Sequence, residues 1–422
     1  MKKISTDIIV IGAGPAGMSA ALKAYEMGIK NILLVDRLPE PGGILQQCVH
    51  DGFGLQKFKE DLTGPEFADR YIKKLGDTDI NVMLHTMVIE MTRDRKMIIS
   101  NDVDGLIEVA PKAIVMAMGC RERTRQQVSI PGTRPSGIFT AGVAQRFMNI
   151  EGYLPGKEVV VVGSGDIGMI MARRMTLEGA KVHAVTEILP YPGGLTRNVV
   201  QCLNDYNIPL YLKHNVIDIR GRDRVEAVKI ARLDDQGNPT GEIFELKCDT
   251  LLFSVGLIPE NELSRMIYLE LSPATGGPFI DDNYQTSREG VFICGNAAFV
   301  NDLADYASTE GEIAGEAAAK YLNDSLEAGT KVRVVAGDNV RFVVPNFITR
   351  TDAVTLYARV TQPMLDITVS SSGGIINMKK QIVKPSEMIE IHFDSEKLEK
   401  VKELPASPAG GRELMIDVRP NK

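Results

Sequence analysis

Two glycine-rich motifs in this chain have the residue types and spacing needed to hold a dinucleotide. The first is GAGPAG at residues 12–17, and the second is GSGDIG at residues 163–168, which begins 151 positions later. In such a motif the first glycine permits a tight turn, the second lets a pyrophosphate approach the backbone, and the third lets a helix pack on a strand. The N-terminus of that helix then faces the anion. Each motif therefore predicts one dinucleotide site.

An acidic residue follows each motif at the distance expected for recognition of a ribose. Asp36 lies 24 residues after Gly12, and Glu187 lies 24 residues after Gly163. A carboxylate at this point can accept a hydrogen bond from a ribose 2′-hydroxyl. The match continues further along the chain, where PEPGG at 39–43 is followed by PYPGG in the second copy. A single glycine motif is weak evidence, but two copies with matching acids predict two bound dinucleotides.

The elements that must position these residues are the strands and helices of an α/β fold. An apolar, β-branched run at 8–11 precedes the first motif, an amphipathic helix is expected after it, and a second strand ends at Asp36. The second motif has the same order of elements. Short β-rich runs separated by turn residues fill 331–422. The predicted fold is two Rossmann-like dinucleotide-binding domains followed by a small all-β C-terminal domain.

The composition excludes several classes of function. With 422 residues, the chain is long enough for two or three domains at roughly 150 residues each. Its net charge of −7 disfavours nucleic acid as a partner. We find neither a signal peptide nor an apolar run long enough to span a membrane. Five cysteines without metal-binding spacing suit reduced thiols in the cytoplasm and predict no metal site.

The chain resembles the flavoproteins with two dinucleotide-binding domains, the pyridine nucleotide-disulfide reductase superfamily. The resemblance spans about residues 5–325 and rests on five motifs in order. These are the two glycine motifs, AIVMAMGCRER at 113–123, DTLLFSVGLIPENEL at 249–263 and TSREGVFICGNAA at 286–298. The resemblance implies an FAD-binding domain split between 1–122 and 263–328, with an NAD-binding domain at 123–262 inserted into it.

The same resemblance implies which residues contact FAD. Asp36 would bind the adenosine ribose, and a helix starting near Ser308 would point at the pyrimidine edge of the flavin. Gly295 and Asn296 would lie at the pyrophosphate and ribityl chain. The family usually has Gly-Asp at these two positions, and asparagine keeps a donor and an acceptor without the charge. The expected FAD-binding residues are Gly12, Gly14, Ala16, Gly17, Asp36, Arg37, Gly42, Gly43, Val88, Gly119, Gly295, Asn296 and Ser308.

The second motif is expected to bind NAD rather than NADP. Glu187 would repel a 2′-phosphate, and the three residues that follow it, 188–190, include no arginine to receive one. The expected NAD-binding residues are Gly163, Gly165, Asp166, Ile167, Gly168, Glu187 and Gly256.

The segment PGGILQQCVH at 41–50 lacks the redox cysteine pair of the disulfide reductases. In that family it reads Gly-Gly-x-Cys-x-x-x-x-Cys, and the two cysteine positions fall here on Leu45 and His50. Cys48 matches neither, so we expect no disulfide reductase activity. His50 is a catalytic candidate that could bond to the flavin or shuttle a proton. Cys48 is a candidate lone redox thiol, although a small buried hydrophobe is the simpler interpretation.

Other groups each have two interpretations. The basic run CRERTR at 120–125 is read as a solvated surface, with anion binding as the alternative. Asp302, Asp305 and Glu310 follow the last flavin motif and either line the nicotinamide face or serve as helix caps and surface groups. Packing is the interpretation of the four remaining cysteines, Cys120, Cys202, Cys248 and Cys294.

A closer resemblance is to a subgroup without the cysteine pair, through GGILQQCVHDGFG, GCRERTR, GSGDIGMIMARRMTLEGAKV and YPGGLTRN. These are similar to FAD-dependent oxidoreductases associated with glycerol-3-phosphate dehydrogenase and, more distantly, to the FAD subunits of opine and sarcosine oxidases. The resemblance implies hydride transfer between NAD(H) and flavin in a multi-subunit dehydrogenase, with a second flavoprotein subunit or other electron-transfer partner, or a small substrate. The alternatives are an NADH oxidase that reduces oxygen, and an FAD-binding assembly subunit with a silent nicotinamide site. Partner docking and structural support both remain open for 331–422.

Overall fold

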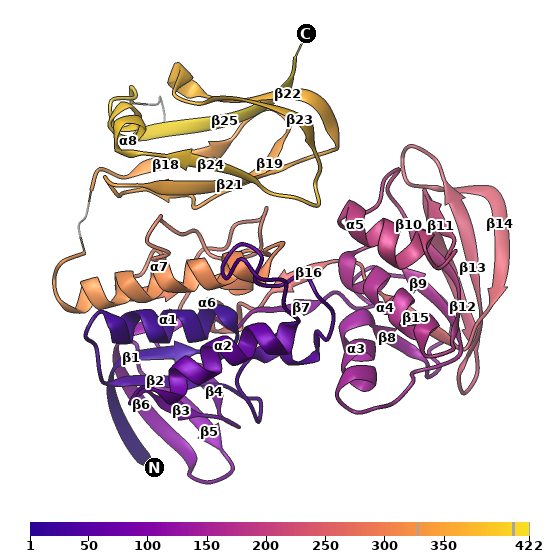
Figure 1. The fold of residues 1–422 in the computed structure, drawn as a ribbon, viewed down its shortest axis with the longest axis horizontal. Helices are drawn as coiled ribbons and strands as arrows, with labels where there is room; N and C mark the ends of the chain where they lie inside the picture. Colours follow the sequence, from indigo (N-terminus) through magenta and orange to yellow (C-terminus); the bar gives the residue numbers. More distant parts are fainter. Residues whose placement is uncertain (327–328, 407–409, 422) are drawn as a thin grey trace. The chain divides into compact units, whose positions relative to one another are not determined.

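The computed structural model describes residues 1–326, 329–406 and 410–421, and the chain within it forms two compact units. One unit contains residues 1–120 and 259–422, and the other contains residues 121–258. Figure 1 shows the elements of both in sequence colours. The second unit is therefore inserted into the sequence of the first. Where the chain passes between them, β7 (Cys120–Glu122) and β16 (Leu257–Pro259) pair as a two-stranded sheet.

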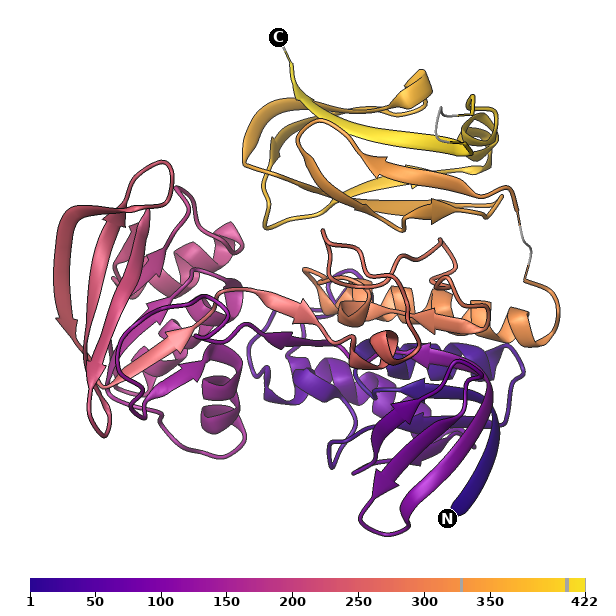
Figure 2. The same cartoon turned by 180° about the vertical axis from the view of Figure 1, so that it is seen from behind.

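A seven-stranded sheet forms the base of the first unit, in the order β3-β2-β1-β6-β5-β4 with β17 also paired to β6. The strands β3, β2, β1, β6 and β17 are parallel neighbours, whereas β4, β5 and β6 form an antiparallel edge, seen from behind in Figure 2. The bounds are β1 (Lys2–Ile11), β2 (Ile32–Val35), β3 (Asn81–Met83), β4 (Met87–Met91), β5 (Met97–Asn101), β6 (Gly105–Met116) and β17 (Val291–Ile293).

Two helices of small residues pack together beside this sheet. Figure 1 shows α1 (Pro15–Glu26) running alongside α7 (Ala304–Leu322). A Cβ at Gly311 would lie 2.1 Å from the Ala16 carbonyl oxygen, and one at Gly315 would lie 2.2 Å from that of Ala20. The backbones can approach this closely only because these positions carry no side chain. This unit also contains α2 (Gly64–Gly76) and the short α6 (Glu262–Met266).

The second unit repeats the parallel-sheet architecture. Its five-stranded sheet has the order β11-β10-β9-β15-β8, and a three-stranded antiparallel sheet has the order β12-β13-β14. The helical bounds are α3 (Ala141–Asn149), α4 (Asp166–Leu177) and α5 (Thr196–Asn198), which continues into a π-helix (Val199–Asn204). The strand bounds are β8 (Ile138–Thr140), β9 (Glu158–Val162), β10 (Lys181–Glu187), β11 (Leu210–Leu212), β12 (His214–Gly221), β13 (Val225–Leu233), β14 (Pro239–Lys247) and β15 (Thr250–Phe253).

The C-terminal region is rich in strands, as predicted, and has its own apolar core. Its sheets have the orders β20-β18-β25-β22-β23 and β19-β21-β24. One short helix that the sequence interpretation did not include, α8 (Ser395–Lys402), is capped by Asp394. The strand bounds are β18 (Val332–Ala336), β19 (Val340–Val344), β20 (Phe347–Ile348), β21 (Val354–Val360), β22 (Met364–Ser371), β23 (Asn377–Val383), β24 (Ile389–Phe393) and β25 (Arg412–Pro420).

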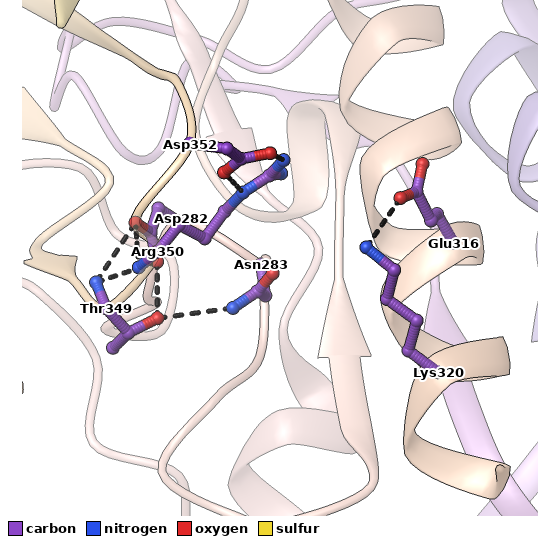
Figure 3. Close-up of polar contacts among 7 residues, drawn as sticks. All are labelled: Asp282, Asn283, Glu316, Lys320, Thr349, Arg350 and Asp352. Atoms are coloured by element: carbon purple, nitrogen blue, oxygen red, sulfur yellow. Dashed lines mark hydrogen bonds and ion pairs between the residues drawn. The ribbon is translucent and has the colours of Figure 1, made fainter. Parts of the chain in front are cut away.

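A buried carboxylate fastens this strand-rich region to the rest of its unit. Asp282 accepts hydrogen bonds from the Thr349 hydroxyl at 2.6 Å and from the backbone nitrogens of Thr349 and Arg350, each at 3.0 Å (Figure 3). The Arg350 guanidinium in turn pairs with Asp352. These polar contacts hold the segment that enters β21 against the loop before β17.

Candidate dinucleotide sites

The first glycine motif lies at the turn between β1 and α1, and its outer glycines are needed for close packing. Gly12 has a φ of +103°, and a Cβ there would lie 2.4 Å from the Ala117 carbonyl oxygen. A Cβ on Gly17 would lie 1.7 Å from the Gly12 oxygen. In contrast, a Cβ on Gly14 would meet nothing within 4 Å. The backbone is therefore crowded behind the turn and open in front of it.

The open side of this turn fits a pyrophosphate. Helix α1 starts after Gly14 without a side-chain cap and without an acidic residue in its first turn. The backbone N–H groups of a first turn lack intrahelical partners, so they are available to an anion. Gly42 and Gly43 border the same place, because the Gly42 nitrogen donates to the Ala13 oxygen at 2.8 Å and a Cβ on Gly43 would be 3.2 Å from Gly14.

Asp36 is held at the end of β2 by two backbone donors. One carboxylate oxygen accepts from the Ala13 nitrogen at 2.6 Å and the other accepts from the Leu38 nitrogen at 2.8 Å. The residue is only 9% exposed. A carboxylate offers about four lone pairs, so one remains on each oxygen for the hydroxyls of a ribose.

Gly295 and Asn296 lie beside the start of the same helix. Gly295 has a φ of +65°, and a Cβ there would come within 2.8 Å of the Ala16 side chain. The Asn296 side chain accepts from the Asn301 nitrogen at 2.9 Å and donates to Cys120 Sγ at 3.5 Å. Cys120 is only half-buried, so its interpretation as a packing residue gives an incomplete account of its contacts.

The remaining expected FAD residues are more scattered. Helix α7 begins at Ala304, so the expectation of a start near Ser308 is wrong by one turn. The Ser308 hydroxyl is fully buried and bonds the Ala304 oxygen within the helix. Val88 pairs with Ile99 at the antiparallel edge of the sheet. Arg37 is exposed. Gly119 has a φ of +75° and lies between the end of β6 and the start of β7.

Glu310 lies beneath Gly295 and is completely buried. One oxygen, Oε2, accepts from the Gly295 nitrogen at 2.7 Å. The Asn301 side chain also lies within hydrogen-bonding reach of the Glu310 carboxyl. Burial raises the pKa of Glu310 to about 8. Glu310 is therefore part of the support of this turn and is inaccessible to a nicotinamide ring.

The other two acids near α7 also have internal partners. Asp305, 2% exposed, accepts from the backbone nitrogens of Gly54, Gln56 and Lys57 at 2.8 to 3.1 Å. Asp302 forms an ion pair with Arg359 and accepts from the Met388 nitrogen. These contacts differ from a helix-capping or surface role, because the carboxylates bind distant segments of the chain.

The segment that replaces the redox cysteines contains a short 3-10 helix (Gly43–Gln47), and the Gly64 nitrogen at the start of α2 donates to the Cys48 oxygen at 2.9 Å. Leu45 is buried and Cys48 is half-buried, with its sulfur 3.2 Å from the Ile44 oxygen. The His50 Nδ1 lies 2.9 Å from the Asp51 oxygen, and its ring lies 5.1 Å from that of Phe53. No disulfide joins any of the five cysteines, all of which lie in the described ranges.

The second glycine motif has the same turn as the first, but Ser254 packs behind it. A Cβ on its middle glycine, Gly165, would lie 2.8 Å from Ser254 Oγ, so this position is less open than in the first motif. Gly163 has a φ of +88°, and a Cβ there would lie 2.2 Å from the Ser254 oxygen. A Cβ on Gly168 would lie 2.5 Å from the Ser254 Cβ, and the Gly168 nitrogen donates to the Ser254 hydroxyl at 3.0 Å. Gly256, two residues after Ser254, has a φ of +101°. Ile167 is partly buried in the first turn of α4.

Glu187 is held in the same way as Asp36, with one additional donor. Its Oε2 accepts from the Ser164 nitrogen at 3.0 Å, and its Oε1 accepts from the Leu189 nitrogen at 3.0 Å. The Ser164 hydroxyl adds a third bond to Oε2 at 2.6 Å and accepts from the Gly193 nitrogen at 2.7 Å. Glu187 is 7% exposed.

Asp166 occupies the first turn of α4 and also holds the segment after β10. Its Oδ1 accepts from the Leu195 nitrogen at 2.8 Å and from the Asn198 side chain at 2.6 Å. The sequence interpretation included Asp166 as a binding residue but missed Ser164 and Ser254. Alignment of the two copies could have revealed Ser164, because the matching residue in the first copy is Ala13.

Two further sequence interpretations concern residues away from the turns. The buried cysteines Cys202, Cys248 and Cys294 lie in the cores, and burial raises the pKa of the Cys248 thiol to about 12. Arg125 is not a solvated residue of the basic run, because it is 8% exposed. Its guanidinium donates to three backbone carbonyls, those of Ile130, Gly132 and Thr133.

Two kinds of feature are absent from the part of the chain that the structure describes. Among these residues, no group of three or more His, Cys, Asp or Glu side chains is arranged to hold a metal ion. No helix in the described ranges is both long enough and apolar enough to cross a membrane.

A family model for pyridine nucleotide-disulphide oxidoreductases matches residues 6–311, which is more than half of the chain. The chain belongs to this family. The family uses FAD together with NAD(P)H, which agrees with the cofactors and the enzyme class that the resemblance implied. The protein is therefore an oxidoreductase that depends on a flavin and a nicotinamide nucleotide.

Two curated relatives are subunits of larger enzymes. Hydrogen cyanide synthase subunit HcnB of Pseudomonas protegens is 24% identical over 75% of this chain and 68% of the relative. One of the opine oxidase subunits of Agrobacterium tumefaciens is 27% identical over 75% of this chain and 66% of the relative. The fold is similar to that of thioredoxin reductase from T. acidophilum, with a TM-score of 0.60 and 23% identity over 76% of this chain and 99% of that one.

Proposed function

We propose that the first glycine motif holds FAD, that the second binds NAD(H), and that the protein transfers hydride between them before exchanging electrons with an external partner or small substrate. The observation that supports this most is the repeated arrangement of the acids. Asp36 and Glu187 each accept two backbone N–H groups from matching positions of their copies. Redox chemistry is what the two cofactors supply, and the chain supplies binding, orientation and exclusion of water.

Under this proposal, different residues of the first unit bind different parts of FAD. The open side of Gly14 and the uncapped start of α1 receive the pyrophosphate. The free lone pairs of Asp36 receive the ribose hydroxyls. The turn at Gly295, supported from below by Glu310, borders the same place. Cys48 and His50 remain the candidates for contact with the flavin, and neither is required for hydride transfer.

We also propose the domain assignment of an FAD domain at 1–122 and 263–328, an NAD domain at 123–262 and a β-rich domain at 331–422. The names of HcnB and of the opine oxidase relative, which describe subunits, support membership of a multi-subunit dehydrogenase with a second flavoprotein or other electron-transfer subunit. The association with glycerol 3-phosphate rests on motif resemblance alone. A cytoplasmic location is consistent with five cysteines that form no disulfide in the structure.

An anaerobic titration of the FAD-loaded protein tests the proposal. Visible flavin absorbance is followed during addition of NADH and, separately, NADPH. Bleaching at lower concentrations of NADH than of NADPH is the expected result, because Glu187 would repel a 2′-phosphate. Failure of both nucleotides to bleach the flavin would overturn the hydride-transfer proposal. Oxygen uptake after re-aeration then distinguishes an oxidase from a dehydrogenase that requires another acceptor.

A further inference from the structure

Ser164 links the ribose-binding acid of the second site to the segment that borders it. Its hydroxyl donates to Glu187 Oε2 at 2.6 Å and accepts from the Gly193 nitrogen at 2.7 Å. The serine is completely buried, so water does not compete for these bonds. A Cβ on Gly193 would lie 3.3 Å from Glu187 Oε2, which places that segment directly against the carboxylate.

The first site joins the same two positions without a side chain. There the Gly42 nitrogen donates to the backbone oxygen of Ala13 at 2.8 Å. Gly42 matches Gly193, and Ala13 matches Ser164, at the constant offset of 151 residues. Asp36 therefore takes no part in the contact between Gly42 and Ala13. In the second site, one hydroxyl, that of Ser164, bonds both Glu187 and the Gly193 nitrogen.

The additional bond changes which lone pairs the acid offers. Glu187 Oε2 already accepts two donors, and Oε1 accepts one from Leu189. Since each carboxylate oxygen has about two lone pairs, only Oε1 retains one for a ligand. Glutamate also has one more rotatable bond than the aspartate of the first site, so its carboxylate needs more contacts to be held in one conformation. The Ser164 hydroxyl supplies that restraint by holding Oε2, and it leaves Oε1 for a ligand.

We propose that Ser164 is a positioning residue that sets the preference of the second site for a nicotinamide dinucleotide with a free ribose 2′-hydroxyl. It acts through Glu187, by orienting Oε1 toward the hydroxyl and keeping the charge where it repels a 2′-phosphate. This inference rests on the proposed assignment of NAD(H) to the second site and adds the residue that determines its specificity.

Isothermal titration calorimetry of the FAD-loaded protein with NAD⁺ and NADP⁺ tests the inference without turnover. Ser164→Ala should weaken NAD⁺ binding by about tenfold, because a hydrogen bond to a charged group contributes on that order. NADP⁺ binding should be unchanged or tighter. The dissociation constant for NADP⁺ divided by that for NAD⁺ should therefore decrease. The control Thr176→Ala removes a hydroxyl that bonds the Ala172 oxygen within α4 and should leave both constants unchanged.

A double-mutant cycle separates positioning from general damage to the fold. If Ser164 acts through Glu187, then Ser164→Ala should have no further effect on the ratio in a Glu187→Ala background. FAD content and the thermal midpoint report whether each variant has folded. Equal constants for Ser164→Ala and the unaltered protein would overturn the inference while leaving the NAD site intact. Absence of binding heat from both nucleotides on the unaltered protein would overturn the NAD assignment and this inference with it.

Discussion

The two glycine motifs are built on one plan but differ in their polar side chains. In both, a positive-φ glycine lies against a backbone oxygen, and an acid at the end of the next strand accepts two backbone donors. The first copy has Ala13 and Pro15 in its turn, where the second has Ser164 and Asp166. Both substitutions fasten the segment at 193–198. Under the proposed function, a few side chains distinguish a site for a resident cofactor from one for an exchanging substrate.

The largest loss of ligand binding is expected from substitution of the first glycine of each motif. Gly12→Ala places a Cβ 2.4 Å from the Ala117 oxygen in a left-handed backbone, which should cost about 3 kcal/mol or more and abolish FAD retention. Gly163→Ala should instead abolish nicotinamide binding while FAD is retained. FAD content after purification and calorimetry with NAD⁺ measure the two outcomes.

Two matched glycines provide the controls for these variants. Gly28 and Gly179 have φ values of +96° and +86°, but a Cβ on either would meet nothing within 4 Å. Gly28→Ala and Gly179→Ala should therefore cost only about 1–2 kcal/mol from backbone strain and leave both ligands bound. If Gly12→Ala and Gly28→Ala behaved alike, close packing at the motif would not be the cause.

The second prediction is that Glu310, which bonds the turn at Gly295, makes the free energy of unfolding depend on pH. Burial raises the pKa of Glu310 from its ordinary value of 4.5 to about 8. Between these values the unfolded chain has lost the proton that the folded protein keeps. The contribution of Glu310 to the free energy of unfolding therefore falls as the pH rises through this window, by at most about 1.4 kcal/mol per pH unit.

Glu310→Gln should remove this contribution, because an amide resembles the protonated carboxyl. Denaturant unfolding at about pH 5 and about pH 8 would show a smaller loss of stability with rising pH in the variant than in the unaltered protein. Glu316→Gln, on the same helix but paired with Lys320 at 2.8 Å, serves as the control. An identical pH dependence in the unaltered protein and Glu310→Gln would show that Glu310 does not keep its proton.

The smallest expected effect is at the start of α4. Asp166→Asn keeps an oxygen for the Leu195 nitrogen but removes a negative charge beside the proposed pyrophosphate position. NAD⁺ should bind a few-fold more tightly, equivalent to about 0.3–1 kcal/mol, and the difference should shrink at high salt. Weaker binding by the variant at low salt would contradict this interpretation and indicate that the Asp166 contacts shape the site.

The recurring parts of the fold could be predicted from the sequence because they depend on local spacing. Glycines at fixed intervals, apolar runs before them and the acids at Asp36 and Glu187 are all carried by short segments. The contacts of Asp305 with Gly54 and Lys57 join residues about 250 positions apart, so no local pattern indicates them. Arg125 was misread for a related reason, since its charge suggested solvent while nearby carbonyls provide a buried set of acceptors.

The distance along the chain between Asp305 and the loop at 54–57 has a consequence for synthesis on the ribosome. That loop cannot be fastened until helix α7 emerges, about 250 residues later. At about 5–20 residues per second, this delay is on the order of 12–50 seconds. The inserted unit at 121–258 is continuous in sequence and is complete before α7 is made. We therefore expect the nascent chain to form its inserted unit first, before the C-terminal half of the enclosing unit has been made.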